Sequence, residues 1–259
     1  MISPEMINAY RQHYQDHGYV VVPSLIPPDL LTPLRDAADR ATDKARRREW
    51  KDVRMVGKQF PPWTVGDDVW GVQNLMHPAM GEKVFAEFYG SEDLLAVSQG
   101  LMGCEREAMQ FDYALSWHRD DVKASATEEE EANALEVRFD AIQWNCALYD
   151  DECLSAVPGS HTVIRTPEQR KANMDGGDMP VHVGKYNLAK KRRTLHGCYG
   201  SPPRGDTTRA RVVLQHDIGY TSDPSFRDTL PESLRPMLDR LNDFREQLAG
   251  AVVGYSQDD

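Results

Sequence analysis

The amino-acid sequence predicts a mainly β protein with flanking α-helices, in which helices pack around an antiparallel barrel or jelly roll. From residue 107 on, short segments with alternating or β-branched residues follow one another between polar or Gly/Pro turns. Before that point and near the end of the chain, apolar residues recur at helical spacing. The 259 residues fit a single domain, 1–259, because β-barrels of this size are commonly one domain.

The N-terminal part, residues 1–106, is predicted to contain helical segments and one strand. Residues 5–17 carry apolar side chains at helical spacing, and the apolar run 19–22 predicts a strand. Residues 30–50 predict a long helix, and residues 81–103 carry a further helical pattern that ends at a glycine. In the long helix, the side chains expected to face inward are Leu30, Leu31, Leu34, Ala37, Ala38 and Ala41.

The barrel is expected to span residues 107–220. Its predicted strands are 108–117, 137–148, 153–157, 192–199 and 209–216. The acidic run Glu128–Glu131 lies in a predicted loop, 124–136, and is expected to form a solvated face rather than a metal site. Residues 231–251 predict a C-terminal helix. Its apolar stripe is expected to pack either on the barrel or on a partner, as in a homodimer or a heterodimer with a related subunit.

Composition and charge exclude several classes of function. The formal net charge is -11, so no nucleic-acid partner is expected, because phosphate contacts need clustered basic residues. No apolar stretch reaches the roughly 18 residues of a membrane span. The N-terminus has no apolar signal region, so a cytoplasmic location is expected. The 4 cysteines form no C-x-x-C pair and are expected to be reduced thiols.

The sharpest chemical motif is the tetrapeptide Trp117-His118-Arg119-Asp120. At the end of a strand, alternation places residues i and i+2 on the same face, so His118 and Asp120 would project together. A histidine from a distant strand would complete a 2-His-1-carboxylate face, which binds non-haem Fe(II) and leaves other positions open. For an isolated H-x-D tripeptide, a salt-bridged surface pair is the simpler alternative.

Several further motifs accompany this tetrapeptide along the chain. The segments WHRDDV, QWNCALYDDECL and VPGSH, with the opening DHGYVVVPSLIPPDLL, closely resemble the phytanoyl-CoA dioxygenase family of Fe(II)/2-oxoglutarate-dependent oxygenases, and its fungal members in particular. The resemblance spans residues 10–216 and implies a cupin-like double-stranded β-helix with the metal at one end. It implies an oxidoreductase with Fe(II) as cofactor and 2-oxoglutarate and dioxygen as cosubstrates. Such an enzyme would hydroxylate, desaturate or rearrange a small organic molecule, in secondary metabolism, with release of succinate and CO2.

The resemblance also implies roles for individual residues. It makes His118 and Asp120 the first two iron ligands and Trp144 an aromatic residue of the cosubstrate pocket. A core tryptophan on a buried strand is compatible with the same position. His161, in the PGSH turn, is favoured as a loop histidine with a local hydrogen bond over a pocket residue.

The third ligand and the arginine that binds the far carboxylate of 2-oxoglutarate have two candidate pairs. The family's strand resembles R-x-x-L-x-x-x-Y, and the segment RRTLHGCY fits it with Arg192 as the carboxylate anchor and His182 as the ligand upstream. An arginine fork gives a bidentate, always charged grip on a carboxylate. The alternative pair is His196 as ligand and Arg209 as anchor. The resemblance favours the first pair.

One interval departs from the family pattern. Between His161 and His182 the family has a further stretch resembling V-x-L-x-x-G-D-x-V-F-Y. Two strands and their turn need roughly 12–18 suitably alternating residues, and the interval in this chain does not supply them. The barrel is therefore predicted either to close differently or to be a shortened form that lacks a strand pair between residues 161 and 182. Two other functions stay open: a shortened, catalytically impaired member that acts as a structural or partner subunit, and a cupin-like metal-dependent hydrolase or isomerase. Substrate contacts are expected from residues 54–75 and 121–136.

Overall fold

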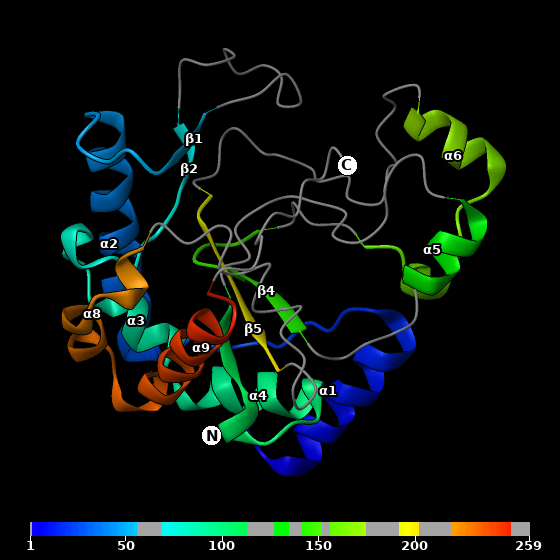
Figure 1. Cartoon of the computed structure of the whole chain (residues 1–259), viewed down its shortest axis with the longest axis horizontal. Coiled ribbons are helices and arrows are strands. Elements are labelled where there is room, and N and C mark those ends of the chain that lie inside the picture. The colour runs from blue at the N-terminus through cyan, green and yellow to red at the C-terminus, as the bar shows by residue number, and fades with distance from the viewer. Residues whose placement is uncertain are drawn as a thin grey trace.

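The computed structural model of the chain describes residues 2–55, 69–112, 127–134, 141–151, 156–174, 192–201 and 219–249. Within them, helices gather around a three-stranded antiparallel sheet, and two further strands form a separate ribbon (Figure 1). Helix outweighs strand in the described residues, so the expected mainly β composition is not found there. Much of the predicted strand content, 113–117, 153–155 and 209–216, falls outside these residues.

The larger sheet has the strand order β3-β5-β4, with β5 in the middle and both pairs antiparallel. The strands of the two sheets are β1 (Val53–Met55), β2 (Val69–Val72), β3 (Gln110–Asp112), β4 (Ala141–Ala147) and β5 (Thr194–Gly200). The predicted strands 137–148 and 192–199 are confirmed as β4 and β5, and β3 is the described part of the predicted strand 108–117. Closure of this sheet into a jelly roll stays a prediction.

The predicted N-terminal helices are confirmed as α1 (Pro4–His17) and α2 (Pro28–Arg46). The Ser3 side chain accepts a hydrogen bond from the Met6 backbone N–H and begins α1, and Gly18 ends it in the left-handed conformation at φ 80°. Along α2, the buried side chains form one stripe of small residues, as its spacing predicts. They are Leu34, Ala37, Ala38, Ala41 and Ala45.

The helical pattern over residues 81–103 is confirmed as two helices, α3 (Val84–Tyr89) and α4 (Glu92–Met102). Helix α4 packs against α1 and β4. Helix α3 is tied to the middle strand by two hydrogen bonds between tyrosines and backbone. Tyr89 donates its hydroxyl to the Cys198 carbonyl, and Tyr199 donates its hydroxyl to the Tyr89 carbonyl. These bonds hold the helices on one fixed face of the sheet.

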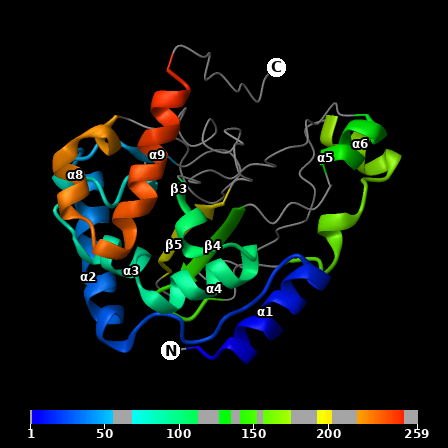
Figure 2. The same cartoon turned by 60° about the horizontal axis from the view of Figure 1, so that its bottom comes forward.

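The predicted C-terminal helix is confirmed as α9 (Arg235–Gln247), which follows α8 (Pro224–Thr229) and packs against β3. Its apolar stripe is buried within this chain. The core joins fully buried side chains from α2, α4, β5 and α9: Leu34, Leu95, Tyr199 and Leu238. The N-terminal helices, the sheet and the C-terminal helix thus share one hydrophobic core (Figures 1 and 2).

The prediction of a strand over residues 19–22 is wrong, because this segment connects α1 to α2 without pairing to another strand among the described residues. The alternation that predicts the strand is present. Val20 and Val22 pack against the core, whereas Val21 is 74% exposed. An extended segment can bury every second side chain without joining a sheet, so periodicity alone does not distinguish the two.

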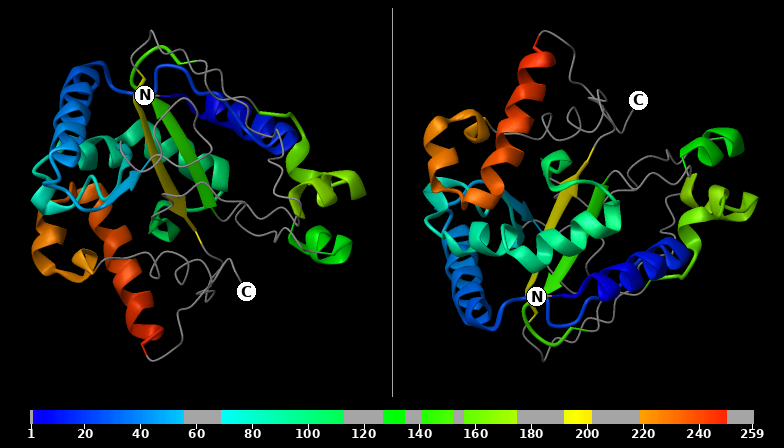
Figure 3. Two further views of the ribbon diagram at one scale, coloured as in Figure 1. Left: turned by 90° about the horizontal axis from the view of Figure 1, so that it is seen from above. Right: turned by 90° about the horizontal axis from the view of Figure 1, so that it is seen from below.

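The prediction that Glu128–Glu131 lies in a loop is wrong, whereas the predicted solvated face is confirmed for Glu128, Glu129 and Glu130, which are exposed. The run forms helix α5 (Glu128–Ala134), and Glu131 is only 3% exposed. Its carboxylate binds Arg165, just before α6 (Pro167–Met174), and Arg170 within this helix. Helix α6 lies in the shortened 161–182 interval. Helices α5 and α6 lie at one edge of the molecule, away from α2, α3, α8 and α9 (Figures 1 to 3).

Short 3-10 helices complete the described elements: η1 (Pro78–Met80), η2 (Arg106–Ala108), η3 (Ser160–Thr162), η4 (Tyr220–Ser222) and η5 (Glu232–Leu234). Across the described ranges, no helix has both the length and the apolar character needed to cross a lipid bilayer.

Candidate functional site

The predicted iron ligands His118, Asp120 and His182 lie outside the described residues, as does the alternative anchor Arg209. The described part of the chain holds no group of three histidine, cysteine or acidic side chains placed to bind a metal ion. Strand β3 precedes His118 and Asp120 in the sequence, and its direction in the sheet is known. Because β3 runs antiparallel to β5, it points toward the end of β5 at which Arg192 lies.

The register of β4 and β5 separates the sheet into a helix-covered face and an opposite face. Trp144 lies directly across from Gly197, and the neighbouring pair on the same face is Ile142 with Tyr199. The helix-covered face is therefore made mainly of apolar and aromatic side chains. The opposite face carries the polar pair Asn145 and His196.

Trp144 is a core residue of the helix-covered face. Its ring meets Phe88 of α3 edge-on, with ring centroids 5.7 Å apart. It also covers Gly197 so closely that a Cβ there would lie 2.1 Å from Trp144 Cζ2, which leaves room only for glycine. Within the described residues, its buried indole N–H has no hydrogen-bond partner. These contacts place Trp144 against the core, as the core alternative expects, and its role in the cosubstrate pocket stays a prediction.

Arg192 lies two residues before β5 and belongs to the opposite face. Leu195 and Tyr199 are buried on the helix-covered side, and alternation carries even-numbered residues such as His196 to the other side. The R-x-x-L-x-x-x-Y spacing is thus explained physically, because its apolar members pack on helices while its arginine projects away from them. Trp144 lies across from Gly197, five residues along the chain from Arg192, and a shared cosubstrate pocket stays a prediction.

The Arg192 guanidinium is held by an acidic residue that sequence reasoning missed. Its Nε donates to Asp151 Oδ2 at 3.0 Å, and the Thr194 hydroxyl donates to the same oxygen at 3.4 Å. Asp151 follows β4, in the acidic turn next to the predicted strand. The only sequence signal for this contact is the Asp150–Asp151 turn, and nothing in it indicates which aspartate faces the arginine.

His196 is a half-buried neutral histidine on the same face as Arg192. Burial lowers its pKa to about 4, and the positive charges of Arg192 and Arg54 act in the same direction. It stands opposite Asn145 on β4. Of the two guanidinium groups near His196, that of Arg192 is paired with the Asp151 carboxylate.

Lowering the pH should destabilise the protein through His196. Because its folded pKa lies below the ordinary value of 6.5, the unfolded chain takes up this proton first, and stability falls as the pH drops from about 6.5 toward about 4. We expect His196→Gln to reduce that fall, measured as the free energy of unfolding in urea at several pH values. His13→Gln, at an exposed position on α1, is the control and should retain it. An unchanged pH dependence in His196→Gln would contradict the assignment.

His161 binds a helix end rather than its own loop. Its Nε2 donates to the Gln15 carbonyl near the end of α1 at 3.2 Å, and the Gly159 N–H donates to the His17 carbonyl at 3.0 Å. A Cβ at Gly18 would lie 2.5 Å from His161 Nδ1. The expectation of a local hydrogen bond is therefore wrong. The PGSH turn anchors α1 and does not contribute to the Arg192 face.

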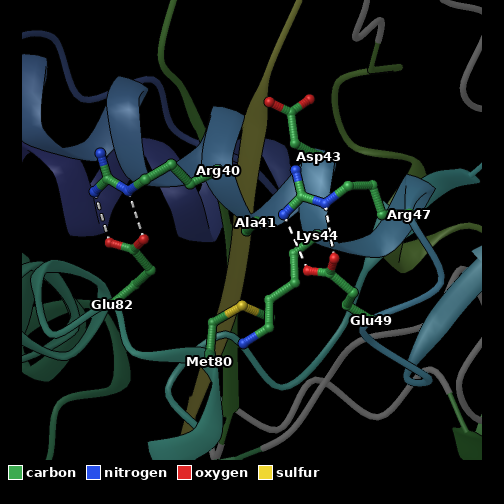
Figure 4. A pocket seen from close by; sticks show the side chains of 8 residues that line it. All are labelled: Arg40, Ala41, Asp43, Lys44, Arg47, Glu49, Met80 and Glu82. Carbon is green, nitrogen blue, oxygen red and sulfur yellow. Dashed lines mark hydrogen bonds and ion pairs between the residues drawn. The ribbon is translucent and has the colours of Figure 1, made fainter.

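A groove of about 290 Å³ runs along α2, away from these residues (Figure 4). Its charged groups already bind one another. Arg40 pairs with Glu82 through two hydrogen bonds of 2.6 and 2.7 Å, and Arg47 pairs with Glu49 at 2.9 and 3.0 Å. The arginines are largely exposed, so these pairs are solvated. The groove has the character of an ion-paired surface, not of a reaction site.

The sequence model of phytanoyl-CoA dioxygenase (PhyH) matches residues 14–195. No curated protein matches the chain. The matched range covers more than two thirds of the chain.

Proposed function

This chain belongs to the phytanoyl-CoA dioxygenase family, and we propose that it is an Fe(II)- and 2-oxoglutarate-dependent dioxygenase that oxidises a small organic molecule. The family is one of Fe(II)/2-oxoglutarate oxygenases. The observation that supports the proposal most directly is Arg192, which lies just before β5 with its Nε bound to Asp151 and its guanidinium partly exposed. We further propose one domain whose β part closes into a jelly roll.

The residues present fit the groups that such an enzyme needs. Two imidazoles and a carboxylate, as His118, His182 and Asp120 would supply, are the donor set that suits non-haem Fe(II) with open positions. For the cosubstrate, Arg192 offers a guanidinium whose side chain is 32% exposed and thus reachable. Bound Fe(II) with 2-oxoglutarate and dioxygen would supply the oxidising chemistry and the decarboxylation to succinate and CO2.

The chain's own part is to bind and orient. Arg192 would hold the far carboxylate of 2-oxoglutarate through two parallel N–H donors, a geometry that lysine cannot reproduce. His196, neutral at physiological pH, adds no further positive charge beside Arg192. The helices that cover the other face hold the sheet rigid, because α3 is bonded to β5 through both tyrosines. A rigid sheet keeps the anchor at a constant distance from any metal bound beyond β3.

The proposal is tested with purified protein under anaerobic conditions. We expect Fe(II) and 2-oxoglutarate together to produce a visible metal-to-ligand charge-transfer band that saturates at roughly one iron per chain. Admission of dioxygen should then yield succinate. Iron binding without the band would contradict the proposal and favour a metal-dependent hydrolase or isomerase. Absence of iron binding would contradict it in favour of a structural subunit.

The structural-subunit function has one specific observation on its side. In the interval where the family has a strand pair, residues Pro167–Met174 form helix α6. A chain that replaces barrel strands by a helix could lose the position of its distal ligand. The iron-binding measurement above separates the two functions.

A further inference from the structure

The segment that leaves β4 is held from two sides. On one side, Arg35 of α2 donates its Nε to the Leu148 carbonyl at 2.6 Å, and its guanidinium lies 4.5 Å from the centre of the Tyr149 ring. On the other, the Leu148 N–H donates to the Arg193 carbonyl at 3.0 Å, which continues the pairing of β4 with β5. The residues that follow therefore start from a fixed point, and Asp151 lies three residues beyond Leu148.

Asp151 presents its carboxylate to the start of β5. Its side chain is only 12% exposed, and its Oδ2 accepts from both Arg192 Nε and Thr194 Oγ1. A charge-assisted bond in a largely buried setting is stronger and more directional than one at an exposed surface. Asp151 thus restrains the arginine through a bond that solvent screens weakly.

The bond uses only one edge of the guanidinium. In the described part of the chain, neither Nη group of Arg192 has a partner, although the side chain is one-third exposed. A guanidinium is planar and its donors are fixed relative to one another, so the direction of the Nε–H also sets the direction of the two-donor outer edge. The observed contact leaves that edge available for a bidentate anion.

We propose that Asp151, supported by Thr194, is a positioning residue that orients Arg192 to receive the far carboxylate of 2-oxoglutarate. This inference rests on the proposed function, because it takes Arg192 as the anchor of the cosubstrate. Two effects of the Asp151 carboxylate oppose each other. Its negative charge repels an incoming dicarboxylate, whereas its bond to Nε removes the freedom of the long arginine side chain. The proposal states that orientation outweighs repulsion, since the Asp151 charge is already engaged by the arginine.

The test compares Asp151→Asn with wild type, and Asp150→Asn is the matched control. Asp150 is the adjacent, exposed aspartate, so its replacement removes the same charge from the same turn. We expect Asp151→Asn to raise both the Kd and the KM for 2-oxoglutarate by about 10-fold or more, while kcat at saturation changes little. Asp150→Asn should leave these values unchanged. A lower Kd in Asp151→Asn would overturn the proposal, because it would make Asp151 a competitor for Arg192.

A second measurement does not depend on iron, 2-oxoglutarate or turnover. In ¹⁵N-resolved NMR spectra of the full chain, the Arg192 Nε–H should exchange slowly with solvent in wild type, and Arg192→Lys identifies its signal by removing it. We expect fast exchange in Asp151→Asn and slow exchange in Asp150→Asn. Slow exchange in Asp151→Asn would overturn the positioning role. If the signal behaves as expected but wild type does not bind 2-oxoglutarate, the proposed function fails instead, and with it the role of Asp151 toward that ligand.

Discussion

Replacement of His118 or Asp120 by alanine is expected to abolish succinate formation, with a loss on the order of 100-fold or more. Each side chain would supply one of three protein ligands to Fe(II), and a two-ligand site no longer holds the metal facially. Iron content after desalting and succinate released per chain are the two measurements. Both should fall together, because the loss of activity follows from the loss of metal.

The control for this pair lies between them in the sequence. Arg119→Ala removes a large charged side chain from the same tripeptide but is not part of the predicted ligand set, so it should retain iron. Unchanged turnover in His118→Ala or Asp120→Ala would contradict the assignment of that residue as an iron ligand. The third ligand is decided in the same assay. We expect iron to be lost in His182→Ala and kept in His196→Gln, and the reverse would establish the alternative pair with Arg209.

Replacement of Glu131 by alanine is expected to open the contact between α5 and α6. The Glu131 carboxylate accepts from both the backbone and the side chain of Arg165 at 2.9 Å, and from Arg170 at 2.5 Å. Removal of one partner from a buried ion pair costs about 3–5 kcal/mol, because it leaves an uncompensated buried charge. Since these helices stand apart from the shared core, we expect local opening (Figure 3). Hydrogen exchange at α5 and α6 amides should become at least about 100-fold faster, with α4 unaffected.

The matched control is Glu129→Ala, two residues earlier on the same helix at an exposed position, where a change within about 0.5 kcal/mol is expected. Equal exchange rates in the two variants would contradict the role of Glu131. The contact should also weaken in acid. Burial alone would raise the pKa of Glu131, but the hydrogen bonds and charges of the two arginines lower it overall from 4.5. Its contribution is therefore complete above pH 4.5 and is lost as the pH falls through the lowered value.

Sequence periodicity predicted most of the helices, and the reason lies in their own faces. The alanine stripe of α2 and the leucine stripe of α9 are buried as their spacing indicates. Their ends are marked by local chemistry as well, as Gly18 shows at the end of α1. Periodicity failed at residues 19–22 and at Glu131. In both places the structure depends on a distant segment. Residues 19–22 have no strand to pair with among the described residues, and Glu131 is buried because Arg165 and Arg170 bind it.

The candidate site was only partly accessible to sequence reasoning. The arginine strand was found because its spacing is local, and the sheet register explains that spacing. The resemblance makes Trp144 a pocket residue, and the structure adds that its ring packs against Phe88 of α3, the core position compatible with that role. One residue of register decides the face of a strand, and a motif without a pairing partner leaves that register undefined. Asp151 could not be found, since it meets Arg192 only once β4 and β5 are paired.

The sequence by itself determined the family and most of the helices, because motifs and helical spacing are local patterns of side chains. Only the tertiary structure decided which of these residues share a face. It packed Trp144 against Phe88, joined Arg192 to Asp151 across 41 positions and buried Glu131 between two arginines. The physical reason is that burial and ion pairing are properties of surfaces brought together by folding. No local pattern in the sequence encodes the partner that a charged side chain will meet.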